Sequence, residues 1–352
     1  MRRIKYIWLV ILCMVFIMIP DKTVYGKEDA YIGVYEPSEE DDETMLVTIS
    51  AVGDCTLGVD YRFRPTFHQF YKKYGASYFF KKVKPVLEND DITIANLEGA
   101  LTSYNYPVEK SYNYKGPKKY ANILKKSSVE VVSLANNHTK DYGEKGFSDT
   151  KNALKDAGVK YCYKSTIAYK KISGIKVAFI GWNALEGVTA KQIQDSLKMA
   201  KKNGAVIRIV SFHWGKMYEA TPNAKQKWLG HMAVDYGADL VIGHHAHILQ
   251  SIEKYKNTYI VYGLGNFVYG GSANPKDKDT MIFQQTFYVK SGKKLDVNEV
   301  KVIPCVQTTD SQSRPFQPKI LKGSAKQRVI DKLNKLSKNY HVKIDKDGYI
   351  YD

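Results

Sequence analysis

Cysteine is scarce in this chain. Four of its 352 residues are cysteines, and no two of them form a C-x-x-C pair. This spacing excludes a disulfide framework and a structural zinc site with thiolate ligands. The sequence also lacks a repeat of about 20–50 residues. It has no zinc-finger, RNA-recognition or helix-turn-helix pattern, so we expect no nucleic-acid partner.

Acidic residues are few relative to basic ones. The chain has 36 Asp and Glu against 53 Lys and Arg, a formal net charge of +17 at pH 7. Such an excess indicates an anionic partner: a polymer, a phosphate-bearing molecule or an acidic membrane surface. The alternative is that lysines merely cover the solvated faces. The hydrophobic fraction of 44% is ordinary and allows a substantial core.

Long apolar runs are missing except at the N-terminus. Residues 1–26 start with basic residues followed by the apolar run Ile7–Pro20. This pattern predicts an export signal, either a cleaved signal peptide or a retained membrane anchor. Residues 27–45 are acidic without an apolar pattern, which predicts a linker. We therefore expect the rest of the chain at the extracytoplasmic face of the cell membrane, anchored there, or secreted.

Strand-like and helix-like runs alternate from residue 46 onward, and consecutive strands follow. Strand patterns occupy residues 45–54, 91–96, 129–136, 205–215, 239–245, 257–268 and 280–290, and a hairpin is expected at Ser173-Gly174. Residues 311–352 form a C-terminal extension with a Lys-rich helix. This order predicts an α/β fold with mixed β-sheets covered by helices.

Six apolar runs end in carboxylate, amide or imidazole side chains. These are Asp54; Asn96 and Glu98; Asn136, Asn137 and His138; His213; His244, His245 and His247; and Asn266. Ligand sites in open α/β sheets lie beyond the carboxyl ends of the strands, so we expect these groups to converge. Nitrogen and oxygen donors without thiolates suit one or two divalent ions such as zinc, manganese or iron. Two such ions can clamp a phosphoryl oxygen and generate a hydroxide nucleophile.

Three of the eight histidines lie within residues 244–247. In an extended strand, side chains two positions apart share a face. If the run is still extended there, His245 and His247 point together and His244 points away. We therefore predict His245 and His247 as metal ligands, one for each metal position. His244 would be a packing residue or a neighbour that supports the ligands.

Six motifs, taken in order, resemble those of a known family. They are SAVGDCTLG, IANLEGALT, SLANNHTKDYGEKG, SFHWG, IGHHAHILQ and YGLGNFV, spread over about residues 45–310. Together they resemble the CapA-like poly-gamma-glutamate capsule synthesis proteins, which are similar to calcineurin-like metallophosphoesterases. The resemblance implies a four-layer α/β/β/α sandwich over residues 46–310, with a metal site at one edge. Such proteins are generally held on the outer face of the cell membrane.

The resemblance also implies roles for individual residues. Asp54 takes the place of the first-strand aspartate, Asn137 that of the amide ligand and His213 that of the isolated histidine ligand. His138 would be the general acid that protonates the leaving group, and Asp141 would orient it. The residues expected to contact substrate are Asn96, Asn136, Asn266 and Trp214.

Two departures from the superfamily pattern affect the metal site. The first motif is normally Asp-x-His, but here Asp54 is followed by Cys55 and Thr56, so one imidazole ligand is absent. Glu98 stands where the carboxylate that bridges two ions is normally an aspartate. The bridging geometry must therefore differ from that of the superfamily.

These features support three functions. The first is a part in synthesis, export or anchoring of poly-gamma-glutamate or a similar anionic polymer, with metal-dependent hydrolysis as its chemistry. Membrane-bound capsule synthesis proteins and the membrane itself would then be partners. The second is a secreted metal-dependent phosphoesterase. The third is a non-catalytic scaffold that binds the polymer.

Overall fold

The computed structural model describes most of the chain from residue 44 onward. The described residues are 44–60, 62, 66–272, 274–310, 312–313 and 315–351. The expected signal or anchor at residues 1–26, and the linker as far as residue 43, lie outside them. Among the helices of this described part, none combines the length and apolar character needed to span a bilayer.

The larger of the two main sheets has nine strands. In spatial order it runs β17 (Lys319–Ile320), β16 (Lys293–Val306), β15 (Asp279–Lys290), β1 (Met45–Thr56), β3 (Ile92–Leu97), β6 (Val131–Ser133), β7 (Lys160–Cys162); β14 (Asn266–Tyr269) also pairs with β1, and β18 (Tyr349–Ile350) with β16. β1 is parallel to β3 and β14 but antiparallel to β15. The sheet is therefore mixed, as the sequence predicts.

The smaller main sheet has six strands. Its order is β12 (Ile252–Tyr255), β13 (Thr258–Val261), β11 (Leu240–His244), β10 (Ile207–His213), β9 (Ile175–Asn183), β8 (Ala168–Ile172). The four central strands are parallel, and both outer strands are antiparallel to their neighbours. β8 and β9 form the hairpin expected at Ser173-Gly174. A three-stranded sheet of β2 (Val59–Asp60), β5 (Tyr114–Gly116) and β4 (Ala100–Leu101) is separate from both.

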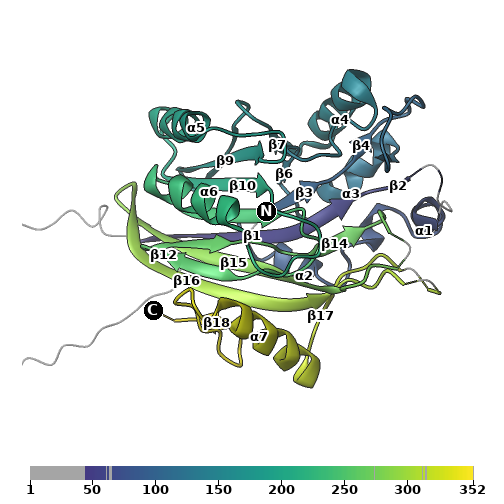
Figure 1. The fold of residues 1–352 in the computed structure, drawn as a ribbon. Coiled ribbons are helices and arrows are strands. Elements are labelled where there is room, and N and C mark those ends of the chain that lie inside the picture. Colours follow the sequence, from purple (N-terminus) through teal and green to yellow (C-terminus); the bar gives the residue numbers. More distant parts are fainter. Residues whose placement is uncertain are drawn as a thin grey trace, which may run out of the picture. The chain divides into compact units, whose positions relative to one another are not determined.

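The two main sheets pack face to face. Ile49 and Ile94 of the larger sheet share one buried cluster with Ile209 and Ile242 of the smaller sheet. The outer face of the larger sheet is covered by α1 (Thr66–Tyr74), α2 (Lys84–Leu87), α3 (Ala121–Lys125), α4 (Gly143–Ala157) and the 3₁₀ turns Ala76–Tyr78 and Lys118–Tyr120. α5 (Ala190–Lys202) and α6 (Ala224–Asp235) cover the smaller sheet, as Figure 1 shows. The expected four-layer α/β/β/α sandwich is confirmed.

Residues 257–268 form two strands, so the expectation of a single strand is wrong. β13 ends at Val261 in the smaller sheet, and β14 begins at Asn266 in the larger sheet. The glycines between them permit this crossing, because Gly265 adopts a left-handed φ of 73°. A Cβ on Gly53 would lie 2.0 Å from the Gly265 carbonyl oxygen, so the backbones meet where no side chain fits. The crossing brings Asn266 beside Asp54.

Residues 311–352 complete the domain instead of extending it. β17 and β18 both pair with β16. α7 (Gly323–Ser337) contributes Val329, Ile330 and Leu333 to the core between the sheets. The described residues between 44 and 351 accordingly belong to one compact unit, and the boundary at residue 310 stays a prediction. Figure 1 shows α7 lying against β16.

Candidate metal centre

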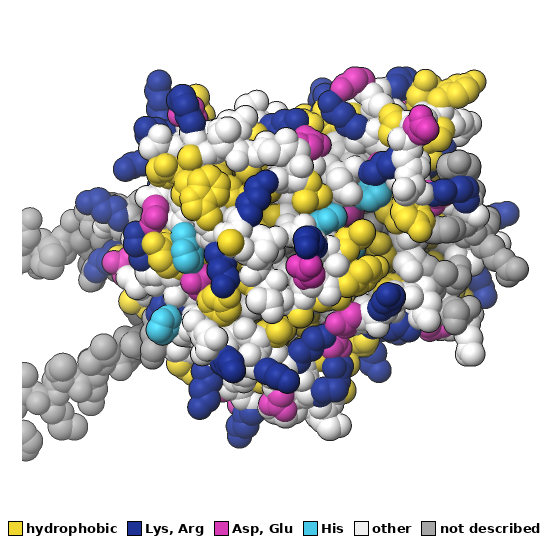
Figure 2. Space-filling view, viewed as in Figure 1, with side chains coloured by type: hydrophobic (Ala, Val, Ile, Leu, Met, Phe, Trp, Pro, Cys, Tyr) yellow, Lys and Arg dark blue, Asp and Glu magenta, His cyan; other side chains and the backbone are white. Residues whose placement is uncertain are grey.

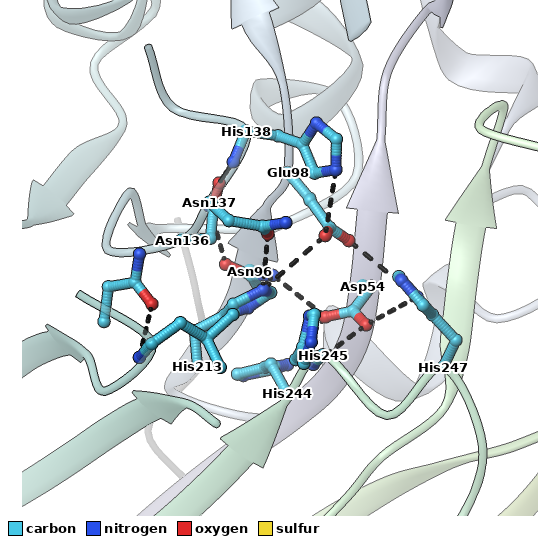
Figure 3. Close-up of polar contacts among 12 residues, drawn as sticks. Asp54, Asn96, Glu98, Asn136, Asn137, His138, His213, His244, His245 and His247 are labelled. Atoms are coloured by element: carbon cyan, nitrogen blue, oxygen red, sulfur yellow. Dashed lines mark hydrogen bonds and ion pairs between the residues drawn. The ribbon is translucent and has the colours of Figure 1, made fainter. Parts of the chain in front are cut away.

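The carboxyl ends of parallel strands from both main sheets meet at one edge. Near the carboxyl end of β1, Asp54 is in register with Asn96 of β3 and with Asn266, which is the first residue of β14. In the smaller sheet, His213 of β10 is in register with His244 of β11. The structure therefore brings the polar strand ends of the sequence pattern into one cluster (Figure 3).

Two groups of three side chains in this cluster are arranged to hold a metal ion. One consists of Glu98, His213 and His245, and the other of Asp54, Glu98 and His247. Within each group the potential ligand atoms lie within 4.8 Å of one another. All five residues are buried, and Glu98 belongs to both groups. A shared carboxylate has the placement that a bridge between two ions requires.

The Glu98 carboxylate provides a test of whether a cation fits. Neither oxygen has a hydrogen-bond partner among the described residues. The surrounding imidazole nitrogens are 3.7 Å away in His213, 3.9 Å in His247 and 4.0 Å in His138. Burying a carboxylate without a partner is costly, whereas an ion bound at about 2 Å from each donor would fill these gaps. The donors therefore fit one or two divalent ions of the zinc, manganese or iron type.

The two carboxylates of the centre differ in acidity. Asn96 Nδ2 donates to Asp54 Oδ1 at 2.9 Å, and the Nδ1 atoms of His244 and His247 lie 3.1 Å and 3.2 Å from the Asp54 carboxylate. Burial opposes ionisation, yet the two imidazoles hold the pKa of Asp54 well below its usual range. Burial raises the pKa of Glu98 to about 8. Asp54 is thus the more acidic of the two carboxylates.

The three histidines of the two ligand groups also differ in pKa. Burial opposes a charge on His247, but the Glu98 and Asp54 carboxylates raise its pKa to about 9. Burial lowers the pKa of His245 to about 4 and that of His213 well below its usual value. At neutral pH, His213 and His245 are therefore neutral, the form that binds metals, while His247 must lose a proton first.

His244 points into the centre, so the prediction that it points away is wrong. β11 ends at His244, and the backbone turns at once, with φ values of 89° at His245 and 58° at His247. Strand alternation therefore does not apply to residues 245–247. His245 and His247 still lie in separate metal groups because the turn presents them there. His244 lies against Asp54 and can support that ligand, as the alternative role predicts.

The His138 side chain is held by Asp141. Its Nδ1 lies 2.7 Å from Asp141 Oδ2, which leaves Nε2 facing Glu98. Burial lowers the pKa of His138, although Asp141 opposes the shift. Next to it, Asn137 Oδ1 lies 2.8 Å from His213 Nε2, so these two predicted ligands face the same point.

Three asparagines predicted to contact substrate are buried, each no more than 2% exposed. Asn136 Nδ2 donates to Asn96 Oδ1 at 3.0 Å, and Asn96 in turn donates to Asp54. Asn266 Oδ1 lies 2.8 Å from His247 Nδ1. Their amides are occupied in holding the centre together. The structure therefore gives them a positioning role, and their contact with substrate stays a prediction.

Trp214 is not at the centre either. It is 1% exposed, stacks on Phe212 with 4.7 Å between ring centroids, and donates from its indole N–H to the Tyr262 carbonyl at 2.9 Å. It belongs to the core beneath α5 and α6. The reason is strand alternation: Trp214 follows His213, so its side chain goes to the opposite face.

The matches to known proteins are consistent with this architecture. Residues 48–270 match the model of the bacterial capsule synthesis protein family PGA_cap. The chain belongs to this family. It is 32% identical over 255 residues to the capsule biosynthesis protein CapA of Bacillus anthracis, a match that covers 64% of this chain and 61% of that protein. The matched region thus spans less than two thirds of that relative.

Other relatives of this PGA_cap protein are more distant. The PGA biosynthesis protein CapA of Bacillus subtilis (strain 168) is 28% identical over 331 residues, covering 87% of this chain and 82% of the relative. A probable polyglutamine synthesis accessory protein of Mycobacterium tuberculosis is 27% identical over 217 residues, 52% of this chain and 57% of its own length. A hypothetical protein from Thermus thermophilus has a similar structure, with a TM-score of 0.47 and 12% identity, covering 73% of this chain and 99% of that one.

Two residues of this PGA_cap protein lie at the centre without having been predicted. Lys110 Nζ lies 2.8 Å from Asp141 Oδ1, and the Tyr114 ring packs 4.4 Å from the His138 ring. Both come from the segment between β4 and the end of β5, which does not end an apolar run. No sequence signal marks them, because a lysine or tyrosine in a polar segment is ordinary on a solvated surface.

Proposed function

We propose that this protein takes part in synthesis, export or anchoring of poly-gamma-glutamate or a similar anionic polymer, and that it acts as a metal-dependent hydrolase. The observation that carries the proposal is Glu98, a buried carboxylate without a hydrogen-bond partner among the described residues. It is shared by two three-ligand groups beside the His138–Asp141 pair. The site of action would be the extracytoplasmic face of the cell membrane.

Three further features support the polymer as substrate. Relatives of the chain are named for capsule or PGA biosynthesis. The formal charge of +17 is complementary to a polyanion. Residues 1–26 have the pattern of an export signal or anchor, which would place the domain next to membrane-bound capsule synthesis proteins.

The residues around the centre suit hydrolysis. A bound divalent ion would polarise the bond to be cleaved and lower the pKa of water near it. His138 presents Nε2 toward Glu98 while Nδ1 is held by Asp141, so this imidazole is oriented to take a proton from the attacking water on Nε2 and to pass it to a leaving group. The buried ligands exclude bulk water, which strengthens each electrostatic contact.

The test uses the purified full-length protein, stripped of metal and reloaded with zinc, manganese or iron(II). Cleavage of poly-gamma-glutamate is followed by the appearance of new chain ends, and cleavage of phosphate esters by phosphate release. We expect metal-dependent polymer cleavage that falls by about 100-fold or more in His138→Ala. His231→Ala is the control, because His231 stacks on Tyr255 away from the ligands.

The outcomes separate the three functions. Phosphate-ester cleavage without polymer cleavage would identify a secreted phosphoesterase and contradict the proposal. If the metal-loaded protein cleaves neither but binds the polymer with steep salt dependence, it is a scaffold. Equal activity in wild type and His138→Ala would remove His138 from the chemistry.

A further inference from the structure

Lys110 brings an ammonium group to the edge of the metal centre from outside the ligand-bearing segments. Its Nζ donates to Asp141 Oδ1 at 2.8 Å and to the Asn137 carbonyl at 2.5 Å. The Lys110 side chain is 29% exposed, whereas that of Asp141 is 1% exposed. Lys110 therefore lies where the buried centre meets solvent. On the face drawn in Figure 2, histidine atoms reach the surface beside hydrophobic and Lys or Arg side chains.

One N–H donor of the Lys110 ammonium group is not used in hydrogen bonds with the described residues. An ammonium group has three N–H donors, and two of them go to Asp141 and Asn137. His138 Nδ1 is 3.3 Å from Nζ, but this atom also lies 2.7 Å from Asp141 Oδ2. Because a carboxylate only accepts, Nδ1 carries the proton of that bond and cannot accept another. The third N–H has no acceptor among the described residues.

The backbone around Lys110 is fixed without its side chain. Val108 N and Asn113 Nδ2 both donate to the Asp141 carbonyl, at 3.0 Å and 3.1 Å. Asn113 N donates to Asp60 Oδ2 at 2.7 Å. These bonds hold the loop on both sides of Lys110. The ammonium group is thus preorganised, which reduces the entropy lost when it binds a ligand.

We infer that Lys110 holds an oxyanion of the substrate beside His138 through its third N–H, while its other two donors brace Asn137 and Asp141. The oxyanion is a carboxylate if the substrate is the polymer and a phosphate oxygen if it is a phosphate ester. The inference rests on the proposed function only in taking the substrate to be anionic. A lysine suits this task because its ammonium is a compact point charge that binds either group.

The test measures binding, which requires no turnover. Glutarate and inorganic phosphate are titrated by calorimetry into the full-length protein, metal-free and manganese-loaded. We expect Lys110→Met to weaken binding of at least one probe by about tenfold, as for loss of one charged hydrogen bond. Lys110→Arg, which keeps the charge, should recover most of the affinity.

Lys115→Met is the matched control. Lys115 lies on the same segment, and its loss changes the net charge equally, but its Nζ donates to Tyr104 O and Asn105 Oδ1 away from the centre. We expect Lys115→Met to bind both probes within about twofold of wild type. If Lys110→Met fails to fold because Asp141 loses its cation, the double variant Lys110→Met/Asp141→Asn removes both charges and allows the same titration.

The outcomes are distinct. Loss of glutarate binding alone supports a polymer carboxylate as the bound group, and loss of phosphate binding alone supports a phosphate ester. Unchanged binding of both probes in Lys110→Met overturns the inference, as does an equal loss in Lys115→Met. The titration measures no cleavage, so a failed hydrolysis assay does not affect its result. If the wild type is an active hydrolase but Lys110→Met binds both probes as well as wild type does, this inference is refuted and the proposed function is not.

Discussion

Glu98 and His247 face each other across the metal centre, with 3.9 Å between Glu98 Oε2 and His247 Nδ1. That separation is too long for a hydrogen bond and close to that of two ligands on one ion. Burial raises the pKa of Glu98 to about 8, and the neighbouring carboxylates raise that of His247 to about 9 against the effect of burial. The pair is therefore arranged to exchange protons for a metal ion.

Metal binding should release protons near neutral pH. Both pKa values are raised and the two groups interact, so the Glu98–His247 pair holds at least one proton at pH 7 that must leave when metal binds. We expect roughly one to two protons released per ion at pH 7 and an affinity that rises as pH increases from about 7 to about 9. Calorimetry in two buffers of different ionisation enthalpy measures the number of protons released per metal ion. A binding enthalpy independent of buffer would contradict the prediction.

Removing the charge of the shared carboxylate should impair both metal positions. We expect Glu98→Gln to lower metal affinity by about 100-fold or more, because Glu98 belongs to both ligand groups. Metal content after dialysis, measured by mass spectrometry, tests this. Glu253→Gln is the control, since Glu253 is also a buried carboxylate beside an imidazole, 3.0 Å from His231, but lies away from the ligands. Equal metal retention in both variants would refute Glu98 as a ligand.

Trp214 should matter for stability and not for ligand binding. Trp214→Phe removes the indole N–H that donates to the Tyr262 carbonyl, so this oxygen loses that hydrogen bond in the core. We expect the free energy of unfolding to fall by about 1–3 kcal/mol, measured by urea denaturation. Glutarate binding to the folded variant should be unchanged. Weakened binding at unchanged stability would restore Trp214 as a substrate contact.

The contact between α7 and β15 should be sensitive to acid. Burial opposes ionisation of Asp279, but hydrogen bonds from Arg328 and Lys332 lower its pKa. A lowered pKa means that the stabilisation is present above the unfolded value of about 3.9 and disappears as pH falls through the folded value. We expect Asp279→Asn to lower the free energy of unfolding by up to about 1 kcal/mol at pH 7.

The difference between wild type and Asp279→Asn should shrink below about pH 4. Denaturation in urea at pH 7 and at pH 3 measures this difference in the free energy of unfolding with Asp279 ionised and after acidification. Asp296→Asn is the control, because Asp296 is exposed and its nearest cation, Lys294, is 4.0 Å away. A difference that does not depend on pH would show that the Asp279 charge adds no stability.

The chemistry of the centre could be predicted because it depends on residue type and strand ends. Parallel strands place their carboxyl ends on one edge, so Asp54, Glu98 and His213 were expected together. The fold class followed from the alternation of strands and helices. The direction of His244 could not be predicted, because it depends on a backbone turn that begins directly after β11.

The positioning role of two asparagines could not be predicted for a related reason. Asn96 and Asn136 are polar residues at strand ends, as a ligand-contacting residue would be. Only the packing shows that their amides are already occupied by Asp54, Asn96 and a backbone carbonyl. A hydrogen-bonding side chain has the same sequence signal whether it faces substrate or a neighbouring residue.

The sequence by itself determined which donors are available and which strand ends carry them, because hydrophobic periodicity sets the strands and the residue types set the ligand chemistry. Only the tertiary structure decided which donors share a point in space. The crossing at Gly265 brings Asn266 to Asp54, and a loop distant in sequence brings Lys110 to Asp141. Such contacts depend on backbone turns and on packing between sheets. Neither of these produces a periodic pattern in the sequence.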